Sequence, residues 1–197
     1  MKSRLFREIQ NLFEELGNTA MDALCPETIG DEVRTEELLW KAADLREKLN
    51  DKTIEALIRY QPLARDMRFI RAVLGSTYDT YRVVRHASRI NVVLNISPDE
   101  KAEHVARDVF NLIRPWLNHG ISAIGRDARI PVDDLPFFES SFEELWEHFS
   151  KTDDPKIMAV LIHGEGIFNH TKHILSSALY YQLGRKGLEK SPILLIT

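Results

Sequence analysis

The chain has 197 residues, of which 44% are hydrophobic and 28% charged, and its formal net charge is −4. This length allows one sizeable core or two small ones, and the charge balance provides no overall attraction to nucleic acid or an anionic membrane. Cys25 is the single cysteine, which excludes an internal disulfide framework and favours a reducing compartment. The N-terminus lacks the apolar core of a signal peptide, and no window approaches the roughly 20 apolar residues that span a bilayer. We therefore expect a soluble, cytoplasmic protein.

Helical spacing of apolar residues predicts three helices in the first half of the chain. The first covers residues 3–24 and ends before a Cys-Pro pair, and the second covers residues 32–60. The third runs from Pro62 to about residue 95, because a proline ring fixes φ near the helical value and its missing N–H has no partner in a first turn.

Three more helices are predicted in the second half. The fourth begins with Ser97 as its N-cap and Glu100 completing a capping box, and it runs to about residue 125 with a bend or an early end at residues 118–120. The fifth covers about residues 136–150, after an irregular connection with two prolines.

The sixth predicted helix starts at residues 154–155 and stops at Gly184. No segment shows the period-2 alternation of a strand. The sequence therefore predicts an all-α protein with six helices.

An internal repeat is indicated by a superposition of residues 85–90 on residues 169–174, an offset of 84 residues. In both segments, a long helix that follows a proline carries a histidine with an isoleucine four residues later. We expect two tandem three-helix units, residues 1–96 and 97–187, followed by a C-terminal tail of residues 188–197.

The segment from Gln61 to Ile70, with the pattern QPxAxDxRFI, and the later Arg82 and His86-Ala87 resemble the PhoU family of phosphate-uptake regulators. The resemblance implies two tandem three-helix bundles in a six-helix array and a regulatory, non-enzymatic role in phosphate homeostasis. It also implies a phosphate transporter subunit or a signalling kinase as partner, a homodimer, and at most a peripheral association with the membrane. No nucleic acid is expected as a partner.

Members of that family bind metal ions through an acidic pair, spaced ExxxD, on the long helix of each repeat. The resemblance implies that metal ligands in this chain would lie at the matching positions. The positions that match this pair are Tyr81 and Arg85 in the first repeat and Glu165 and Asn169 in the second. Only Glu165 keeps a carboxylate, so most of the metal chemistry of the family is lost here. We expect a divergent member and no obligatory cofactor.

The third predicted helix also carries arginines within one sector roughly 100° wide. A guanidinium donates two parallel hydrogen bonds to an oxyanion, so the sector is a candidate surface for docking a partner. The alternative is a solvated face that pairs with carboxylates of the second helix, such as Glu36 and Asp44. The candidate partner-binding residues are Arg68, Arg71, Arg82, Arg85 and Arg89.

Histidines of the sixth predicted helix provide the alternative function, a metal-binding bundle protein or enzyme. His163, His170 and His173 share a broad sector of this helix, where imidazoles are able to bind zinc, nickel or iron. We expect His170 and His173 to be exposed polar surface, with a divalent metal as the competing hypothesis. The candidate metal ligands are Glu165, Asn169, His170 and His173.

No recognised catalytic motif is present, since the chain lacks a glycine-rich phosphate loop, an HExxH pair and an EF-hand loop. The three tryptophans, Trp40, Trp116 and Trp146, are expected to be core or groove anchors. An exposed aromatic pair, Tyr180-Tyr181, is a candidate for the dimer interface.

Overall fold

A computed structural model describes residues 4–96 and 98–184. Within these ranges the chain is all-α, which confirms the predicted fold class, and two short 3-10 turns complete its regular structure. The α-helices are α1 (Arg4–Ala23), α2 (Glu32–Tyr60), α3 (Ala64–Ile96), α4 (Glu100–Gly125), α5 (Leu135–Phe149) and α6 (Pro155–Leu183).

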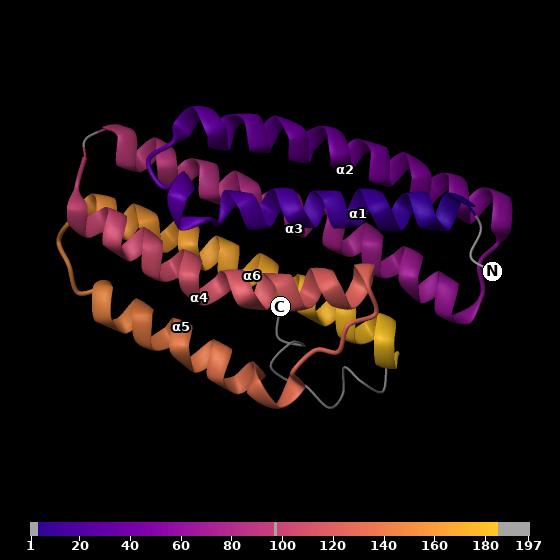
Figure 1. Cartoon of the computed structure of the whole chain (residues 1–197). Helices are drawn as coiled ribbons and strands as arrows, with labels where there is room; N and C mark the ends of the chain where they lie inside the picture. The colour runs from indigo at the N-terminus through magenta and orange to yellow at the C-terminus, as the bar shows by residue number, and fades with distance from the viewer. Residues whose placement is uncertain (1–3, 97, 185–197) are drawn as a thin grey trace.

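The helices lie side by side as an elongated array, with α2 along one edge and α5 along the opposite edge (Figure 1). Helices α1, α2 and α3 pack on one another, and α4 packs closely on α6, whereas α5 makes fewer contacts with either. The two groups meet through α3 against α6, which is the most extensive helix pairing, and through α1 against α4. The expected division at residue 96 falls between α3 and α4, and the expected tail, residues 188–197, lies outside the described residues.

One continuous hydrophobic core joins both groups of helices. Each helix contributes an apolar face at helical spacing; Ile9, Phe13 and Leu16 do so in α1, and Phe110 and Ile113 do so in α4. These side chains are almost fully buried. The array is therefore held together by shared burial of apolar surface, not by two separate cores.

The predicted start of the fourth helix was wrong. The side chain of Asp99 caps α4, because its Oδ1 accepts hydrogen bonds from the backbone N–H groups of Lys101 at 2.9 Å and Ala102 at 3.1 Å. Glu100 is therefore the first residue of α4, too early to complete a capping box. Ser97 lies outside the described residues.

One other boundary differs from the prediction, and one agrees with it. Helix α3 begins at Ala64, two residues after Pro62, because the positive φ values of Gln61 (41°) and Ala64 (47°) turn the chain between α2 and α3. Helix α4 ends at Gly125, as predicted, and continues through residues 118–120 without the early end that was the alternative. A Cβ on Gly120 would lie 2.8 Å from Cγ2 of Ile174, so this glycine allows α4 to approach α6 closely and does not end the helix.

The expected positions of two aromatic side chains were also wrong. Trp40 is 70% exposed on α2 and anchors no core, whereas Trp116 is buried. Tyr181 is only 2% exposed and packs edge-on against Phe69 of α3, so Tyr180-Tyr181 is not an exposed pair. Among the described helices, none has the length and apolar character needed to cross a membrane.

Candidate functional site

A line of charged and imidazole side chains fills the contact between α3 and α6. We call it the polar seam, and it consists of Asp79, Arg82 and His86 from α3 with His163, His170 and His173 from α6. The two helices run antiparallel, since Arg68 near the start of α3 donates to the backbone oxygen of Tyr181 near the end of α6. This direction brings the middle of each helix, where the histidines occur, to the same level.

Asp79 forms one end of the polar seam. Its Oδ1 lies 2.8 Å from Nδ1 of His170 and 3.3 Å from Nδ1 of His173. The side chain of Asp79 is only 12% exposed, and those of His170 and His173 are 16% and 37% exposed. The expectation that both histidines are exposed surface is therefore wrong for His170.

Arg82 and the histidine pair of His86 and His163 form the other end. The Nε atom of Arg82 donates to Nε2 of His170 at 3.4 Å, and Nδ1 of His86 lies 3.3 Å from Nδ1 of His163. Burial, and then the neighbouring His170 and Arg82, lower the pKa of His86 from 6.5 to about 4. Burial and Arg89 also lower the pKa of His163. This end of the seam therefore disfavours further positive charge on its imidazoles.

The two ends correspond to each other through the 84-residue repeat. Asp79 and His86 of α3 are equivalent to His163 and His170 of α6, so the Asp79–His170 pair matches the His163–His86 pair. The rings of His86 and His170, which are equivalent residues, have centroids 5.6 Å apart. The repeat thus places a carboxylate, Asp79, at one end of the seam where the other end has an imidazole, His163. The geometry of the two ends is similar, but their chemistry differs.

A glycine makes room for the histidine pair. A Cβ on Gly166 would lie 2.5 Å from Cε1 of His86, closer than real contacts allow. Gly166 occupies the position equivalent to Arg82. The first repeat therefore has an arginine side chain at this position, whereas the second has a glycine that leaves space for the ring of His86. The close approach of α6 to His86 thus depends on the missing side chain.

The candidate arginines do not share one environment. Arg71, Arg85 and Arg89 are exposed, whereas Arg68 and Arg82 are half-buried against α6. Carboxylates of α2 do not pair with them: Asp44, for example, binds Lys48 at 2.6 Å. In the described part of the chain, none of these five arginines forms an ion pair.

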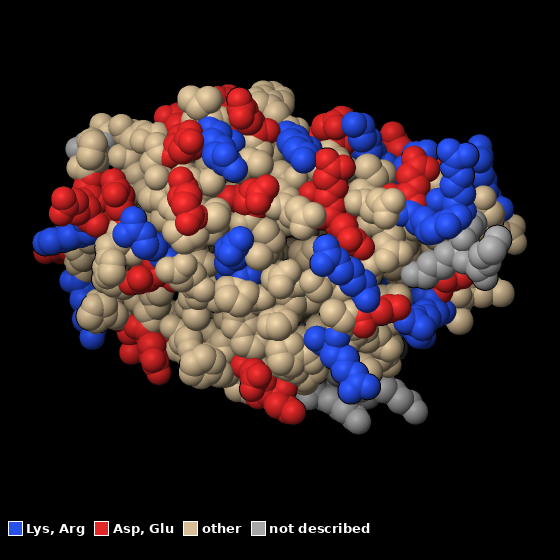
Figure 2. Space-filling view, in the orientation of Figure 1, with Lys and Arg blue, Asp and Glu red and all other residues tan. Residues whose placement is uncertain are grey.

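The face formed by α1, α2, α4 and α5 provides a contrast. Positive and negative side chains intermingle along it (Figure 2), and several pair directly, as Lys41 does with Glu15 at 3.0 Å and Lys52 with Glu8 at 3.1 Å. Ion pairing of this kind leaves little charge available for a partner. The exposed arginines Arg71, Arg85 and Arg89 of α3 form no such ion pair within the described chain, so their positive charge remains available to a partner.

Glu165 and Asn169 point to a different side of α6 from His170 and His173. With Glu143, Trp146 and Glu147 of α5, they line a cavity of about 310 Å³ between the two helices. The group of ligand atoms that lie within 4.8 Å of one another is instead Asp79, His170 and His173. The structure thus separates the four candidate ligands into two pairs and adds Asp79 to the histidine pair.

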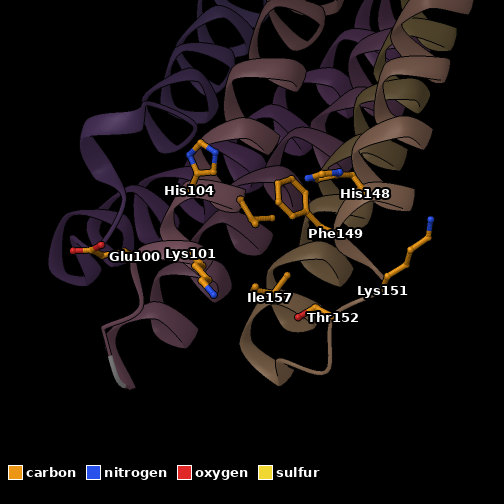
Figure 3. A pocket seen from close by; sticks show the side chains of 9 residues that line it. Glu100, Lys101, His104, His148, Phe149, Lys151, Thr152 and Ile157 are labelled. Atoms are coloured by element: carbon orange, nitrogen blue, oxygen red, sulfur yellow. The ribbon is translucent and has the colours of Figure 1, made fainter.

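A larger cavity, of about 540 Å³, opens between α4, the end of α5 and the start of α6. Phe149 lies between His104 and His148 in Figure 3, while Glu100 and Lys151 extend outward at opposite rims. Because these ionisable side chains do not converge on one point, the cavity offers no arrangement for catalysis.

Asp79 is the seam residue that sequence reasoning missed. It lies in Ser76-Thr77-Tyr78-Asp79-Thr80, a polar run inside a helix whose other buried residues are mostly apolar. Such a run is the signal that a helix packs against a polar partner.

Comparisons of the chain with family models, with curated proteins and with solved structures gave no significant match.

Proposed function

We propose that this chain is a non-enzymatic, PhoU-like regulator of phosphate uptake that acts by binding another protein through the exposed arginines of α3. The support for the family is the motif of residues 61–70 together with six helices arranged as two groups of three. The observation that carries the binding surface is that Arg71, Arg85 and Arg89 are exposed and, within the described chain, form no ion pair with a carboxylate. The guanidinium of Arg71 also lies 4.8 Å from the centre of the Tyr180 ring, and this contact leaves its charge unneutralised.

The chemistry of this surface favours an acidic partner. Three guanidinium groups on one helix attract carboxylates over several ångströms and then donate paired hydrogen bonds on contact. The resemblance narrows the partner to a phosphate transporter subunit or a signalling kinase. Arg82 contributes less to such a surface, because it already contacts His170 and His86.

An enzyme built on Glu165 and the histidines is not favoured. Glu165 faces α5, whereas His170 and His173 face α3, so no single substrate position lies between them. Binding of a partner protein through the arginines of α3 does not require Glu165 and the histidines to face one position.

The test is affinity capture with the full chain from cells grown with abundant or limiting phosphate. We expect the wild-type chain to retain a phosphate transporter subunit or a signalling kinase, identified by mass spectrometry. The triple variant Arg71→Glu, Arg85→Glu and Arg89→Glu should lose it, because each reversal replaces attraction by repulsion.

A matched control is available on other helices. Arg7, Arg34 and Arg107 are also exposed, and reversing all three changes the net charge by the same amount. This control should capture the partner as the wild type does. Equal capture by both triple variants, or capture of neither partner class by the wild type, would contradict the proposal.

A further inference from the structure

We propose that Asp79, His170 and His173 bind one divalent transition-metal ion of the Zn²⁺ type, which links the two groups of helices across the α3–α6 contact. The residues come from both groups, because Asp79 belongs to α3 and the two histidines lie on successive turns of α6. This site is separate from the exposed arginines and from the cavity beside Glu165.

The distances suit coordination. Zinc binds imidazole nitrogen and carboxylate oxygen at about 2.0–2.2 Å, which places neighbouring ligand atoms of a tetrahedral site about 3.3–3.6 Å apart. The Nδ1 atoms of His170 and His173 lie 2.8 Å and 3.3 Å from Oδ1 of Asp79. All three ligand atoms lie within 4.8 Å of one another, so small side-chain rotations close the set around one ion.

The ligand chemistry selects the class of metal. Two imidazoles and one carboxylate are borderline and hard donors, the set that suits zinc, ferrous iron and their neighbours and not calcium or magnesium. Three protein ligands leave a coordination position for water. The 37% exposure of the His173 side chain provides the route by which the ion enters.

The burial of Asp79 requires compensation. A carboxylate that is only 12% exposed loses hydration, and its ionic partners within the described chain are the two histidines alone. A divalent ion bound to Oδ1 places positive charge beside this carboxylate and takes the place of its hydrogen bonds with the two imidazole nitrogens.

The positive charge of Arg82 disfavours metal binding, so replacing Arg82 should have the opposite effect to replacing one of the metal ligands. When Nδ1 of His170 binds a metal, its Nε2 carries the proton, so the 3.4 Å contact from Nε of Arg82 is lost. The guanidinium charge also repels the cation. Replacing Arg82 by Met should therefore tighten metal binding, although it removes a contact of the seam.

The experiment uses the full chain without a polyhistidine tag, stripped with a chelator. Titration with Zn²⁺ in a calorimeter, and with Co²⁺ followed by visible absorption, should give one ion per chain. Asp79→Asn and His173→Gln should each weaken Zn²⁺ binding at least tenfold, and Arg82→Met should strengthen it about threefold or more. His173 is partly exposed, so His173→Gln should fold even where Asp79→Asn does not; circular dichroism checks both.

The matched control is His104→Gln. His104 also pairs with a carboxylate, Asp108 at 3.5 Å, but its side chain is 64% exposed on α4. This variant should bind Zn²⁺ as the wild type does. Absence of Zn²⁺ binding at micromolar concentrations, equal binding by wild type and His173→Gln, or weakened binding in His104→Gln would overturn the proposal.

Discussion

The histidine pair of His86 and His163 places two imidazoles where charge is unfavourable. Their Nδ1 atoms lie 3.3 Å apart, so one nitrogen donates a proton that the other accepts, and the pair is satisfied only while it is not fully protonated. Burial and the guanidinium of Arg89 keep the pKa of His163 below its ordinary value of 6.5. The charge state of this pair is therefore linked to folding.

Acidification should weaken the fold through this pair. The unfolded chain takes up a proton on His163 as the pH falls below about 6.5, whereas the folded chain does so only at lower pH, so the free energy of unfolding decreases in that range. Urea denaturation at pH 7.5 and pH 5 measures this decrease. It should be smaller in His163→Gln, whose amide still reaches His86 but does not titrate.

The control for this measurement is His104→Gln, which removes a mostly exposed histidine of α4. Its loss of stability between the two pH values should equal that of the wild type. A wild-type chain as stable at pH 5 as at pH 7.5, or the same pH-dependent loss in His163→Gln, would show that the pair does not couple to folding.

At the scale of single elements, a glycine sets the approach of α1 to α4. A Cβ on Gly17 would overlap with Cγ2 of Ile121, a β-branched side chain with little freedom to move in a helix. Gly17→Ala should therefore destabilise the protein by about 1–3 kcal/mol through overpacking, although alanine favours a helix. The midpoint of urea denaturation measures the change.

Gly75→Ala provides the comparison. Its Cβ would lie 3.3 Å from Oγ of Ser177, a hydroxyl that is able to rotate away on the partly exposed side of α3. We expect a change within about 1 kcal/mol, because the gain in helix propensity offsets this contact. A Gly17→Ala variant as stable as Gly75→Ala would mean that α1 and α4 are free to separate.

The existence and limits of the helices could be predicted from local sequence. The spacing of Leu5, Ile9 and Leu16 and the stop at Gly184 depend on neighbours in the chain, and the structure confirms them. The predictions of the cap, which is Asp99, and of the start of α3, which is Ala64, were each wrong by two residues, because several residues near each boundary are able to cap or turn the chain.

The polar seam could not be predicted in the same way. Periodicity places His170 on the polar side of α6, but only the antiparallel packing on α3 brings it to Asp79. For the same reason, Arg82 was expected in solvent and is half-buried beside His170. Contacts between residues about 90 positions apart depend on tertiary packing, which the spacing within one helix does not encode.

At the scale of the whole molecule, the two groups of helices form a scaffold that holds α3 and α6 against each other. One shared core and the Asp79–His170 contact fix this pairing, and the pairing leaves Arg71, Arg85 and Arg89 exposed on α3. The central claim is that a partner in phosphate uptake binds those arginines.

Phosphate uptake in cells tests this claim most directly. The gene is deleted and replaced by the wild type, by the Arg71→Glu, Arg85→Glu, Arg89→Glu variant, or by the equally charged Arg7→Glu, Arg34→Glu, Arg107→Glu control. Uptake of labelled phosphate is then measured after a shift from limiting to abundant phosphate. We predict that deletion alters the uptake response, and that the wild type and the control restore it whereas the α3 variant does not; an unchanged response after deletion, or full restoration by the α3 variant, would contradict the account.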